Sequence, residues 1–367
     1  MYIYQYKDWP RFTWDEAKLL PQLIEIRHRQ GRLLGRMEAL GFQLREEAVL
    51  QTMTLEIIKT SEIEGEKLDT EQVRSSVARK LGMDVAGLIL ADRNVEGIVD
   101  MIMDATQRYK EELNDERLFG WHSALFPIGR SGMYKIVVGN WRDNKPDSPM
   151  QVVSGTFGKE KVHFQAPDGD KVANEMEAFF TWFNSEFTLD PVLKSAITHL
   201  WFVTIHPFDN GNGRIARTIA DMQLARADGT SQRFYSMSAQ IRQERNDYYK
   251  ILEKTQKGRL DITEWIEWFL GCLDRSIIAS DQILARVMHK ARFWEYLATK
   301  NLNDRQRLMI KKMLDGFDGK MQSSKWAKIT KASQDTAARD IQNLIEQGVL
   351  EKEEGGGRST SYRLIEL

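Results

Sequence analysis

The segment from residue 205 to 217 brings together residue types suited to phosphate chemistry. It reads IHPFDNGNGRIAR, so His206 precedes a turn rich in glycine, and Arg214 and Arg217 follow one helical turn apart. An imidazole can remove a proton near neutral pH, and glycines at a helix start let an anion approach free backbone N–H groups. The pattern predicts either a polyphosphate site with a base at its edge, or a tight structural turn with a surface histidine.

Two helices must position this turn. Residues 191–205 have helical periodicity with proline in the first turn, and Pro207 stops that helix, so His206 projects from a helix end. The next helix has a core face of Ile215, Ile219 and Met222 and ends near Gly229. We expect Arg214 and Arg217 to share the face opposite this core stripe.

A carboxylate is the next candidate. Residues 15–64 read as two long helices with a break at Gly41, and Glu64 falls on the same helical face as Leu50, Met53 and Ile57. Gly65 ends the helix, which places Glu64 in the last turn, where the helix dipole disfavours a negative charge. Glu64 therefore either has a cationic partner or lies in water at a frayed helix end.

Further helices and one hairpin are predicted around these residues. Residues 129–170 are rich in glycine and proline, and strands at 151–153 and 161–164 indicate a β-hairpin that either packs on the helices or binds an extended partner. His122 and Cys272 are expected to be core residues. Helices are expected at 70–114, at 115–126 and at 171–187; the first is punctuated by Gly82 and Gly87, with Leu88, Ala91, Val95, Ile98 and Ile102 on one face.

The run from His206 to Arg217 resembles the signature loop of the Fic family, and the resemblance extends over about residues 118–270. Members of that family typically transfer AMP from ATP to a Ser, Thr or Tyr hydroxyl of a target protein, within a helical core that carries a β-hairpin flap. The resemblance implies that His206 is the general base and that Phe208 anchors the loop. It implies that phosphate oxygens are bound by Gly211, Asn212, Gly213, Arg214 and Arg217.

The same resemblance assigns roles outside the loop. Val152 and Val153 in the flap would receive the target segment by main-chain pairing, and Tyr248 and Tyr249 would either line the adenine site or pack in the core. Residues 60–65 are similar to the family's inhibitory-helix motif, in which the glutamate, here Glu64, pairs with the second arginine and obstructs the γ-phosphate. In some members such a glutamate instead orients a water that removes AMP from a modified protein.

One position departs from the family pattern. The family usually has Asp or Glu where this chain has Asn210, at the place that helps to hold Mg²⁺. An amide oxygen is a poorer ligand for a hard divalent cation than a carboxylate, and the adjacent Asp209 is expected to point elsewhere. The resemblance therefore implies ATP with Mg²⁺, or Mn²⁺, but a weakened metal site.

The C-terminal residues 301–367 resemble a winged helix-turn-helix. Asn303 and Gln306 form a potential capping box, Ser333 caps a later helix, and strands at 349–352 and 361–365 flank a run of three glycines. This module binds DNA, or it serves protein docking or dimerisation. Its charge balance is weakly basic, with 12 Lys and Arg against 10 Asp and Glu from residue 302 onward. The candidate DNA contacts are Thr336, Arg339, Asn343 and Arg358.

Composition limits the class of protein. The chain has 367 residues, 42% of them hydrophobic, and 52 Lys and Arg balance 53 Asp and Glu, so no global field directs it to nucleic acid or a membrane. A single cysteine excludes an internal disulfide, and no apolar run is long enough to span a membrane. A cytoplasmic protein, with a homodimer as a reasonable expectation, fits this composition.

These observations predict a mainly α protein. Residues 1–110 form an N-terminal helical domain with the inhibitory helix, 111–275 a Fic-type core with a β-hairpin flap, 276–300 a connecting helix, and 301–367 the winged helix. The predicted function is an autoinhibited protein adenylyltransferase. The alternatives are a Glu64-dependent enzyme that removes AMP, and a non-catalytic regulator that binds DNA through residues 301–367.

Overall fold

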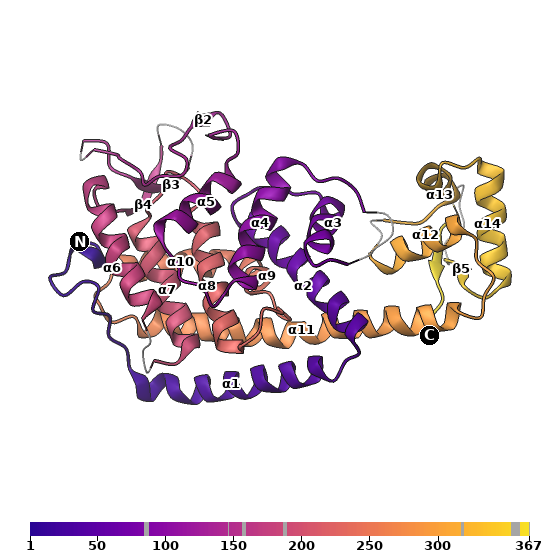
Figure 1. The fold of residues 1–367 in the computed structure, drawn as a ribbon, viewed down its shortest axis with the longest axis horizontal. Helices are drawn as coiled ribbons and strands as arrows, with labels where there is room; N and C mark the ends of the chain where they lie inside the picture. The colour runs from indigo at the N-terminus through magenta and orange to yellow at the C-terminus, as the bar shows by residue number, and fades with distance from the viewer. Residues whose placement is uncertain are drawn as a thin grey trace. The chain divides into compact units, whose positions relative to one another are not determined.

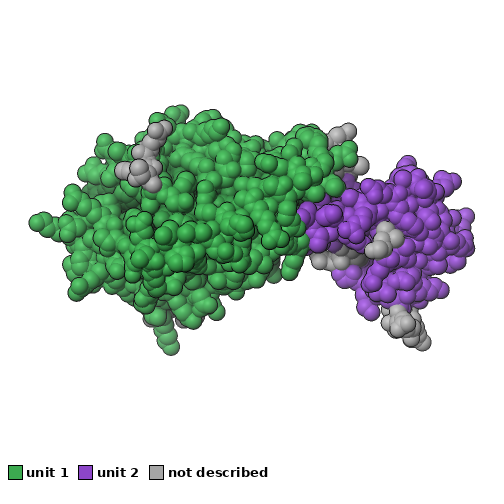
Figure 2. Space-filling model, turned by 90° about the horizontal axis from the view of Figure 1, so that it is seen from below, with its two compact units in different colours: residues 1–283 green, residues 284–367 purple. Residues whose placement is uncertain are grey.

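Helices form where the sequence has helical periodicity, and they make up most of the described chain. The computed structural model describes residues 1–83, 88–145, 147–155, 159–185, 189–316, 319–353 and 360–366. These residues form two compact units, 1–283 and 284–367 (Figure 2). The predicted fold class, mainly α with small β-hairpins, is confirmed. No described helix is long and apolar enough to cross a membrane.

Local capping signals fix the start of the N-terminal helices. A short 3-10 helix η1 (Ile3–Gln5) precedes α1 (Glu16–Glu38), whose N-cap Asp15 accepts a hydrogen bond from the Lys18 amide. Gly41 precedes α2 (Phe42–Ile63), as expected for the predicted break. Leu50, Met53 and Ile57 of α2 are buried, which confirms the predicted apolar face.

Two further helices connect the N-terminal pair to the core, α3 (Thr70–Lys80) and α4 (Arg93–Gln107). The prediction that the helical face begins at Leu88 was wrong, because Asp92 caps α4 through the amides of Asn94 and Val95, and Leu88 and Ala91 precede it. Gly87 lies outside the described residues. α5 (Asp115–Leu125) approaches α4 so closely that a Cβ on Gly97 would lie 1.8 Å from the Ala124 carbonyl oxygen.

The centre of the first unit is the pair α7 (Pro191–Ile205) and α8 (Asn212–Asp228), which pack against each other (Figure 1). α8 is buried on nearly every side, because α1, α2, α4 and α9 also contact it. Arg214 and Arg217 are each only 4% exposed. The expected face opposite the core stripe is therefore covered by protein rather than open. The remaining helices are η2 (Gly169–Lys171), α6 (Val172–Asn184), α9 (Met237–Gln243), α10 (Arg245–Gln256) and α11 (Thr263–Leu297).

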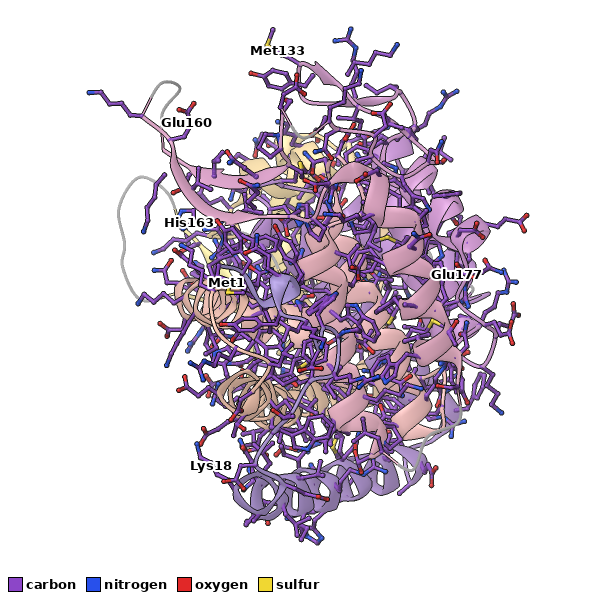
Figure 3. All side chains as sticks on the ribbon, turned by 90° about the vertical axis from the view of Figure 1, so that its left-hand side faces the viewer. Met1, Lys18, Met133, Glu160, His163 and Glu177 are labelled. Carbon is purple, nitrogen blue, oxygen red and sulfur yellow. The ribbon has the colours of Figure 1, made fainter. Side chains whose placement is uncertain are left out.

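Two hairpins lie at one edge of the first unit, opposite α1 (Figures 1 and 3). The predicted hairpin consists of β3 (Gln151–Ser154) and β4 (Lys161–Gln165), which pair antiparallel with Gln151 opposite Gln165 and an irregularity between Val152 and Val153. A second hairpin, β1 (Arg130–Ser131) with β2 (Tyr134–Lys135), was not predicted. Its strands are too short for a period-two pattern to be visible in the sequence.

In the described part of residues 284–367, the C-terminal end of α11 is followed by three short helices and two strands in the predicted order. They are α12 (Asp304–Leu314), α13 (Ser323–Thr330), α14 (Gln334–Glu346), β5 (Leu350–Lys352) and β6 (Tyr362–Leu364). The capping box of Asn303 with Gln306 is present, and Trp326 and Leu344 are buried in the core of this unit. The three glycines and Arg358 lie outside the described residues. The winged-helix classification stays a prediction.

Candidate active site

The turn between α7 and α8 carries His206 in an unusual backbone conformation. His206 caps α7 with φ 52° and ψ 58°, in the left-handed region that side chains other than glycine seldom adopt. Gly211 is also left-handed, and a Cβ there would lie 2.9 Å from the ring of Phe126, so glycine is required for both its conformation and its contacts. The chain reverses within six residues and enters α8 at Asn212.

The His206 imidazole is set up to accept a proton. Its Nδ1 lies 3.3 Å from the carbonyl oxygen of Val203, which can only accept a hydrogen bond, so Nδ1 carries the hydrogen and Nε2 has the free lone pair. Burial, together with the charge of Arg142, lowers the pKa of His206 to about 4. The side chain is therefore neutral near pH 7.

Arg142 stabilises the turn by hydrogen bonds to main-chain carbonyl oxygens. This residue was not predicted from the sequence. This buried guanidinium donates through Nε to the His206 carbonyl oxygen at 2.7 Å, and through Nη2 to the carbonyl oxygens of Pro167 at 2.6 Å and Ile205 at 3.1 Å. Its own amide donates to the Pro207 carbonyl oxygen at 3.0 Å. Arg142 lies between the expected helices, in a region whose only visible signal is turn-like composition, so no periodicity could have identified it.

Asn212 closes the loop on itself. Its Oδ1 accepts the Phe208 amide at 3.0 Å, and its Nδ2 donates to the Phe208 carbonyl oxygen at 2.7 Å. Phe208 is fully buried and stacks on His122 with 4.2 Å between ring centroids. The expectation that Phe208 anchors the loop agrees with this packing. Because the Asn212 side chain is engaged, only its backbone N–H is available to an anion.

His122 is a core residue, as expected, and both of its ring nitrogens have partners. Nδ1 accepts the Gly139 amide at 3.2 Å, and Nε2 donates to the Asn210 carbonyl oxygen at 3.2 Å. Burial lowers its pKa to about 4. His122 is thus a neutral connector between α5 and the loop. Cys272 is also fully buried, as predicted.

The residues at the expected metal position do not fit a protein-held Mg²⁺. The Asn210 Oδ1 accepts the Gly211 amide at 2.6 Å, while its Nδ2 donates to the Ser131 hydroxyl at 2.7 Å. The Asp209 carboxylate accepts the Val137 amide at 2.8 Å, so it points elsewhere, as expected. Across the described ranges no three His, Cys, Asp or Glu residues form a group that could hold a metal ion.

Glu64 lies at the N-terminal end of α8. Its Oε1 is 2.8 Å from the Arg217 Nη2, and a Cβ on Gly213 would lie 2.4 Å from the same oxygen. Thr60, one turn earlier in α2, accepts from the Arg217 Nε at 2.8 Å through its hydroxyl and from Nη2 at 3.0 Å through its carbonyl oxygen. A carboxylate therefore occupies the position where helix N–H groups and an arginine attract an anion. Of the two expectations for Glu64, a cationic partner or a solvated helix end, the contact with Arg217 fits the first.

A second carboxylate engages the other arginine. Glu66 Oε2 lies 2.6 Å from the Arg214 Nη1, and the Arg214 guanidinium also lies over the Phe126 ring at 5.2 Å. Glu66 was not predicted from the sequence, because this residue follows the end of α2 and so falls on no helical face. Its spacing of two residues from Glu64 across Gly65 was the only available signal.

The β3–β4 hairpin is tied to α10. His163 Nδ1 lies 2.7 Å from Glu253 Oε2, and its Nε2 lies 2.6 Å from the Ser154 hydroxyl. Val152 is half-buried and Val153 is 48% exposed, so the outer part of β3 is accessible. In α10, Tyr248 is buried, and its hydroxyl is hydrogen-bonded to the His199 Nε2 at 2.9 Å. This packing favours the core role for Tyr248 over an adenine contact. Tyr249 is half-buried and lies under Arg245.

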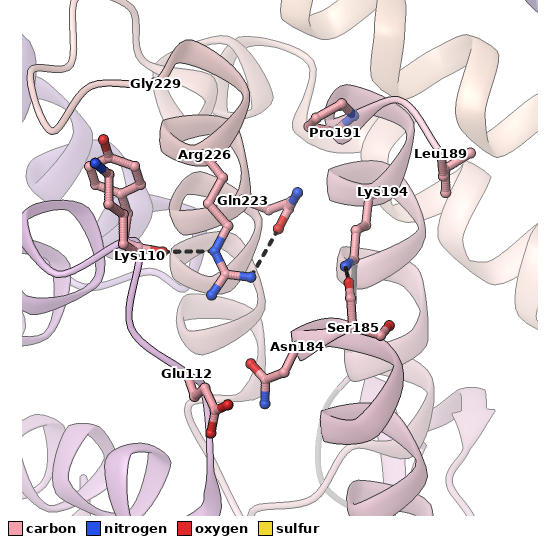
Figure 4. A pocket seen from close by; sticks show the side chains of 11 residues that line it. Lys110, Glu112, Asn184, Ser185, Leu189, Pro191, Lys194, Gln223, Arg226 and Gly229 are labelled. Carbon is pink, nitrogen blue, oxygen red and sulfur yellow. Dashed lines mark hydrogen bonds between the residues drawn. The ribbon is translucent and has the colours of Figure 1, made fainter. Parts of the chain in front are cut away.

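Cavities lie near both ends of α8. One of about 400 Å³ adjoins Arg214 and Glu66. The other, of about 520 Å³, lies near the C-terminal end of α8, and Lys194 and Arg226 are among the residues that line it (Figure 4). Arg226 donates to the carbonyl oxygens of Tyr109 and Glu111, so it ties segments of the fold together. Twelve residues separate Arg214 from Arg226, which is about 18 Å along a helix, so the larger cavity is remote from the loop.

Two family models match the chain. One, described as the Fic/DOC family, covers residues 112–224, and the other, a domain of unknown function (DUF4172), covers residues 2–83. The protein adenylyltransferase Fic of Drosophila yakuba is 33% identical over 132 residues, which are 34% of this chain and 25% of that protein. Its counterpart in Culex quinquefasciatus is 31% identical over the same shares. The matched region thus spans about a quarter of these relatives.

Solved structures share the fold. A Fic family protein from Desulfovibrio desulfuricans superposes with a TM-score of 0.52 at 20% identity, covering 94% of this chain and 96% of that one. A signaling protein with a Fic domain from Bacteroides thetaiotaomicron also gives a TM-score of 0.52 at 20% identity, over 72% of this chain and 97% of its own. At this identity the likeness establishes the architecture.

Proposed function

We propose that this chain, whose residues 112–224 match the Fic/DOC family model, moves AMP from ATP onto a hydroxyl side chain of a target protein and that Glu64 restrains this transfer. The observation that carries the proposal is the position of the Glu64 carboxylate, on Arg217 and against Gly213 at the start of α8. A phosphate of ATP would need the same place. The names of the adenylyltransferase relatives support the reaction class.

In the proposed reaction, His206 Nε2 removes the proton of a Ser, Thr or Tyr hydroxyl of the target. The hydroxyl oxygen attacks the α-phosphorus of ATP, and the bond to the β-phosphate oxygen breaks, so that pyrophosphate leaves. The neutral imidazole and its Nδ1 contact with Val203 support this role. The lowered pKa makes His206 a weak base in the free protein, and a bound polyphosphate would raise that pKa by its negative charge.

The phosphate oxygens would be held by main-chain N–H groups and arginines. The amides of Asn212 and Gly213 lie at the start of α8, the Gly211 amide would have to leave the Asn210 Oδ1, and Arg214 and Arg217 extend from the first turns of the helix. Nη1 of Arg217 is buried without a hydrogen-bond partner in the described residues, which leaves a donor for a phosphate. Val152 and Val153 would pair with the target's main chain. Magnesium would be bound mainly through the nucleotide, since the Asn210 side chain is engaged within the protein.

The test uses ATP labelled at the α-phosphate, with magnesium or manganese, and a cell lysate as the source of targets. We expect the Glu64→Gly variant to label itself or a lysate protein, and the wild type to label far less. Glu62→Gly is the matched control, because it removes a carboxylate from the same helical turn that pairs with Lys59 rather than with Arg217. Adding His206→Ala should abolish the label. Absence of label with Glu64→Gly protein that retains His206 would rule out the proposal.

A second candidate reaction uses Glu64 productively. The Glu64 side chain is 30% exposed, so a water molecule can reach its carboxylate. Oriented there, water would attack the phosphorus of an AMP-modified side chain and release AMP. Incubating wild type and Glu64→Ala with an AMP-modified protein separates the two reactions, because only removal requires Glu64. Loss of AMP with both proteins alike would exclude the second candidate.

DNA binding by residues 301–367 stays a prediction, as does a homodimer. Arg339 is exposed on α14, but the Asn343 Oδ1 already accepts from Gln306 at 2.9 Å and from Gln347 at 2.6 Å, so only its amide N–H groups are available to a base. The test is salt-dependent binding to a promoter fragment with the full chain and with a chain ending at Lys300. Equal binding by the two proteins would exclude this region as the DNA contact.

A further inference from the structure

Three side chains outside the candidate active site are connected in the order of a serine nucleophile, a base and an orienting carboxylate. Ser154 ends β3, His163 lies in β4, and Glu253 lies in α10. The His163 Nε2 is 2.6 Å from the Ser154 hydroxyl oxygen, and the His163 Nδ1 is 2.7 Å from the Glu253 Oε2. The proposed AMP transfer uses none of these side chains. We call this group the Ser154 triad.

The charges of the Ser154 triad fix the direction of its hydrogen bonds. Hydrogen bonds from Lys257 and His163 lower the pKa of Glu253 to about 2, so this carboxylate is ionised near pH 7. An ionised carboxylate only accepts hydrogen bonds, and the His163 Nδ1 therefore carries the hydrogen. In the neutral imidazole the lone pair is then on Nε2, which accepts the Ser154 hydroxyl. These are the roles that activate a serine nucleophile.

The fold holds the base in place and leaves the nucleophile accessible. The side chains of His163 and Glu253 are each 26% exposed, and the neighbouring Phe164 is buried. Ser154 is exposed and lies opposite Lys161 in the hairpin. The contact between His163 and Glu253 joins the hairpin to α10, whereas the contact of Ser154 stays within the hairpin. Attachment of the hairpin therefore accounts for the first contact but not for the second.

The residue after Ser154 carries an N–H group suited to a developing negative charge. Gly155 has φ 113°, a conformation that other residues seldom adopt, and a Cβ there would lie 2.8 Å from the Lys159 carbonyl oxygen. Residue 155 therefore has no side chain that could shield its own N–H group. In α/β-hydrolases the N–H group after the nucleophile binds the oxyanion of the tetrahedral intermediate. Because Gly155 provides one such donor, we expect the site to act only on esters with a good leaving group.

From this geometry we propose that Ser154 accepts the acyl group of small activated esters and that His163 acts as the base, so that the chain hydrolyses them. The Ser154 oxygen bonds to the ester carbonyl carbon while its proton passes to the His163 Nε2. The bond from that carbon to the alcohol oxygen then breaks, and the alcohol leaves with the proton. Water, deprotonated by His163, attacks the acyl-serine, the carboxylic acid is released, and Ser154 regains its proton. Glu253 is a positioning residue that orients the imidazole. The proposed AMP transfer and this reaction are independent of each other.

The test measures the release of p-nitrophenol from p-nitrophenyl acetate by the full chain. Exposed imidazoles hydrolyse this ester slowly without a serine, so the variants decide the assignment. We expect Ser154→Ala to lower the rate by about tenfold or more, to the level of that background. Ser148→Ala is the matched control, because Ser148 is also exposed and its described hydrogen bonds use only its main-chain atoms. Its rate should equal that of wild type.

A fluorophosphonate probe gives a readout that does not depend on the folding of any variant. In the wild type the Ser154 oxygen is expected to displace fluoride from phosphorus, and mass spectrometry should find the label on Ser154 but not on Ser148. Glu253→Gln should slow hydrolysis and move its pH–rate profile to lower pH, because the protonated imidazole loses a stabilising carboxylate. Equal hydrolysis by wild type and Ser154→Ala, with no label on Ser154, would overturn the proposal.

Discussion

Single residues far apart in the sequence determine the shape of the His206 turn. The sequence indicated His206, Arg214 and Arg217, because their types and spacing carry a chemical pattern. It did not indicate Arg142, whose role is to bind main-chain carbonyl oxygens. Carbonyl oxygens belong to every residue, so a side chain that binds them leaves no pattern. The residues proposed for the reaction could be named from the sequence, and the residue that holds the backbone could not.

Arg142→Met is expected to destabilise the first unit by about 3 kcal/mol, because three buried carbonyl oxygens lose a charged donor. Chemical denaturation followed by tryptophan fluorescence measures the change. Arg259→Met is the control, since Arg259 is exposed, and it should lie within about 0.5 kcal/mol of wild type. Equal stability of the two variants would mean that water or a relaxed loop satisfies these carbonyl groups.

Asn210→Asp is expected to lower the magnesium concentration needed for half-maximal AMP transfer by about tenfold, because a carboxylate is a better ligand for a hard cation than an amide. The measurement is a magnesium titration in the Glu64→Gly background, where transfer is expected to be observable. Ser131→Ala in the same background is the control: it removes the hydroxyl that Asn210 contacts and adds no charge. A magnesium requirement that is the same in both variants would contradict the assignment of position 210.

At the scale of elements, the sequence analysis located most helices and placed their ends within a few residues. Glycines and caps were reliable where the structure uses them as such, as at Gly41, Gly65 and Asn303. It failed where a helical pattern continued past a real cap, at Asp92, and where strands were only two residues long. The prediction that Arg214 and Arg217 share the face opposite the core stripe left open what covers that face. Sequence periodicity shows which face of α8 is apolar, but not that α2 covers the polar one.

Gly97→Ala is expected to destabilise the first unit by about 3 kcal/mol. The added Cβ would clash with the Ala124 carbonyl oxygen, so α4 would have to move away from α5. Gly120→Ala is the matched control in α5, because nothing lies within 4 Å of the added Cβ. It should stabilise by up to about 1 kcal/mol, as alanine favours a helix over glycine. Thermal unfolding of the two variants should shift in opposite directions, and a shared direction would contradict the close approach.

At the scale of the whole molecule, the two compact units were foreseen only in part. The structure separates residues 1–283 from 284–367, a division that falls inside the long helix α11. No composition change marks that point, because one continuous helix crosses it. The proposed finer boundaries at residues 110 and 275 lie within the first unit and stay predictions. The balance of charged residues predicted no long-range electrostatic field over the molecule. The arginines of the candidate site each contact a carboxylate of the same chain.

Buried histidines make the first unit sensitive to acid. Burial lowers the pKa of His122 to about 4 and that of His199 to about 3, below the ordinary value near 6.5 that both regain on unfolding. The unfolded chain therefore binds more protons at these histidines than the folded chain does. The free energy of unfolding falls as the pH drops below about 6.5. From about pH 7 to about pH 5.5 we expect a loss of about 2 kcal/mol from these two residues.

Urea unfolding at the two pH values measures this loss. His199→Gln should remove about a third of the pH dependence, because His122 and His206 also have pKa values lowered to about 4 and the introduced amide does not titrate but can still bond to Tyr248. His28→Gln serves as the control, since His28 is exposed, and it should retain the full dependence. A wild-type stability that does not change between the two pH values would contradict the buried neutral state of these histidines.

The turn of Glu64, Gly65 and Glu66 has a consequence for binding equilibria, because both carboxylates belong to the same chain as the arginines that they contact. A tethered group acts at an effective concentration that is of millimolar order for short flexible links. Under the proposed function, a nucleotide that binds Arg217 would have to displace this internal competitor, so its apparent affinity would fall by the ratio of bound to released turn. Dilution of the protein would leave that ratio unchanged. The proposed restraint would therefore not depend on the protein concentration.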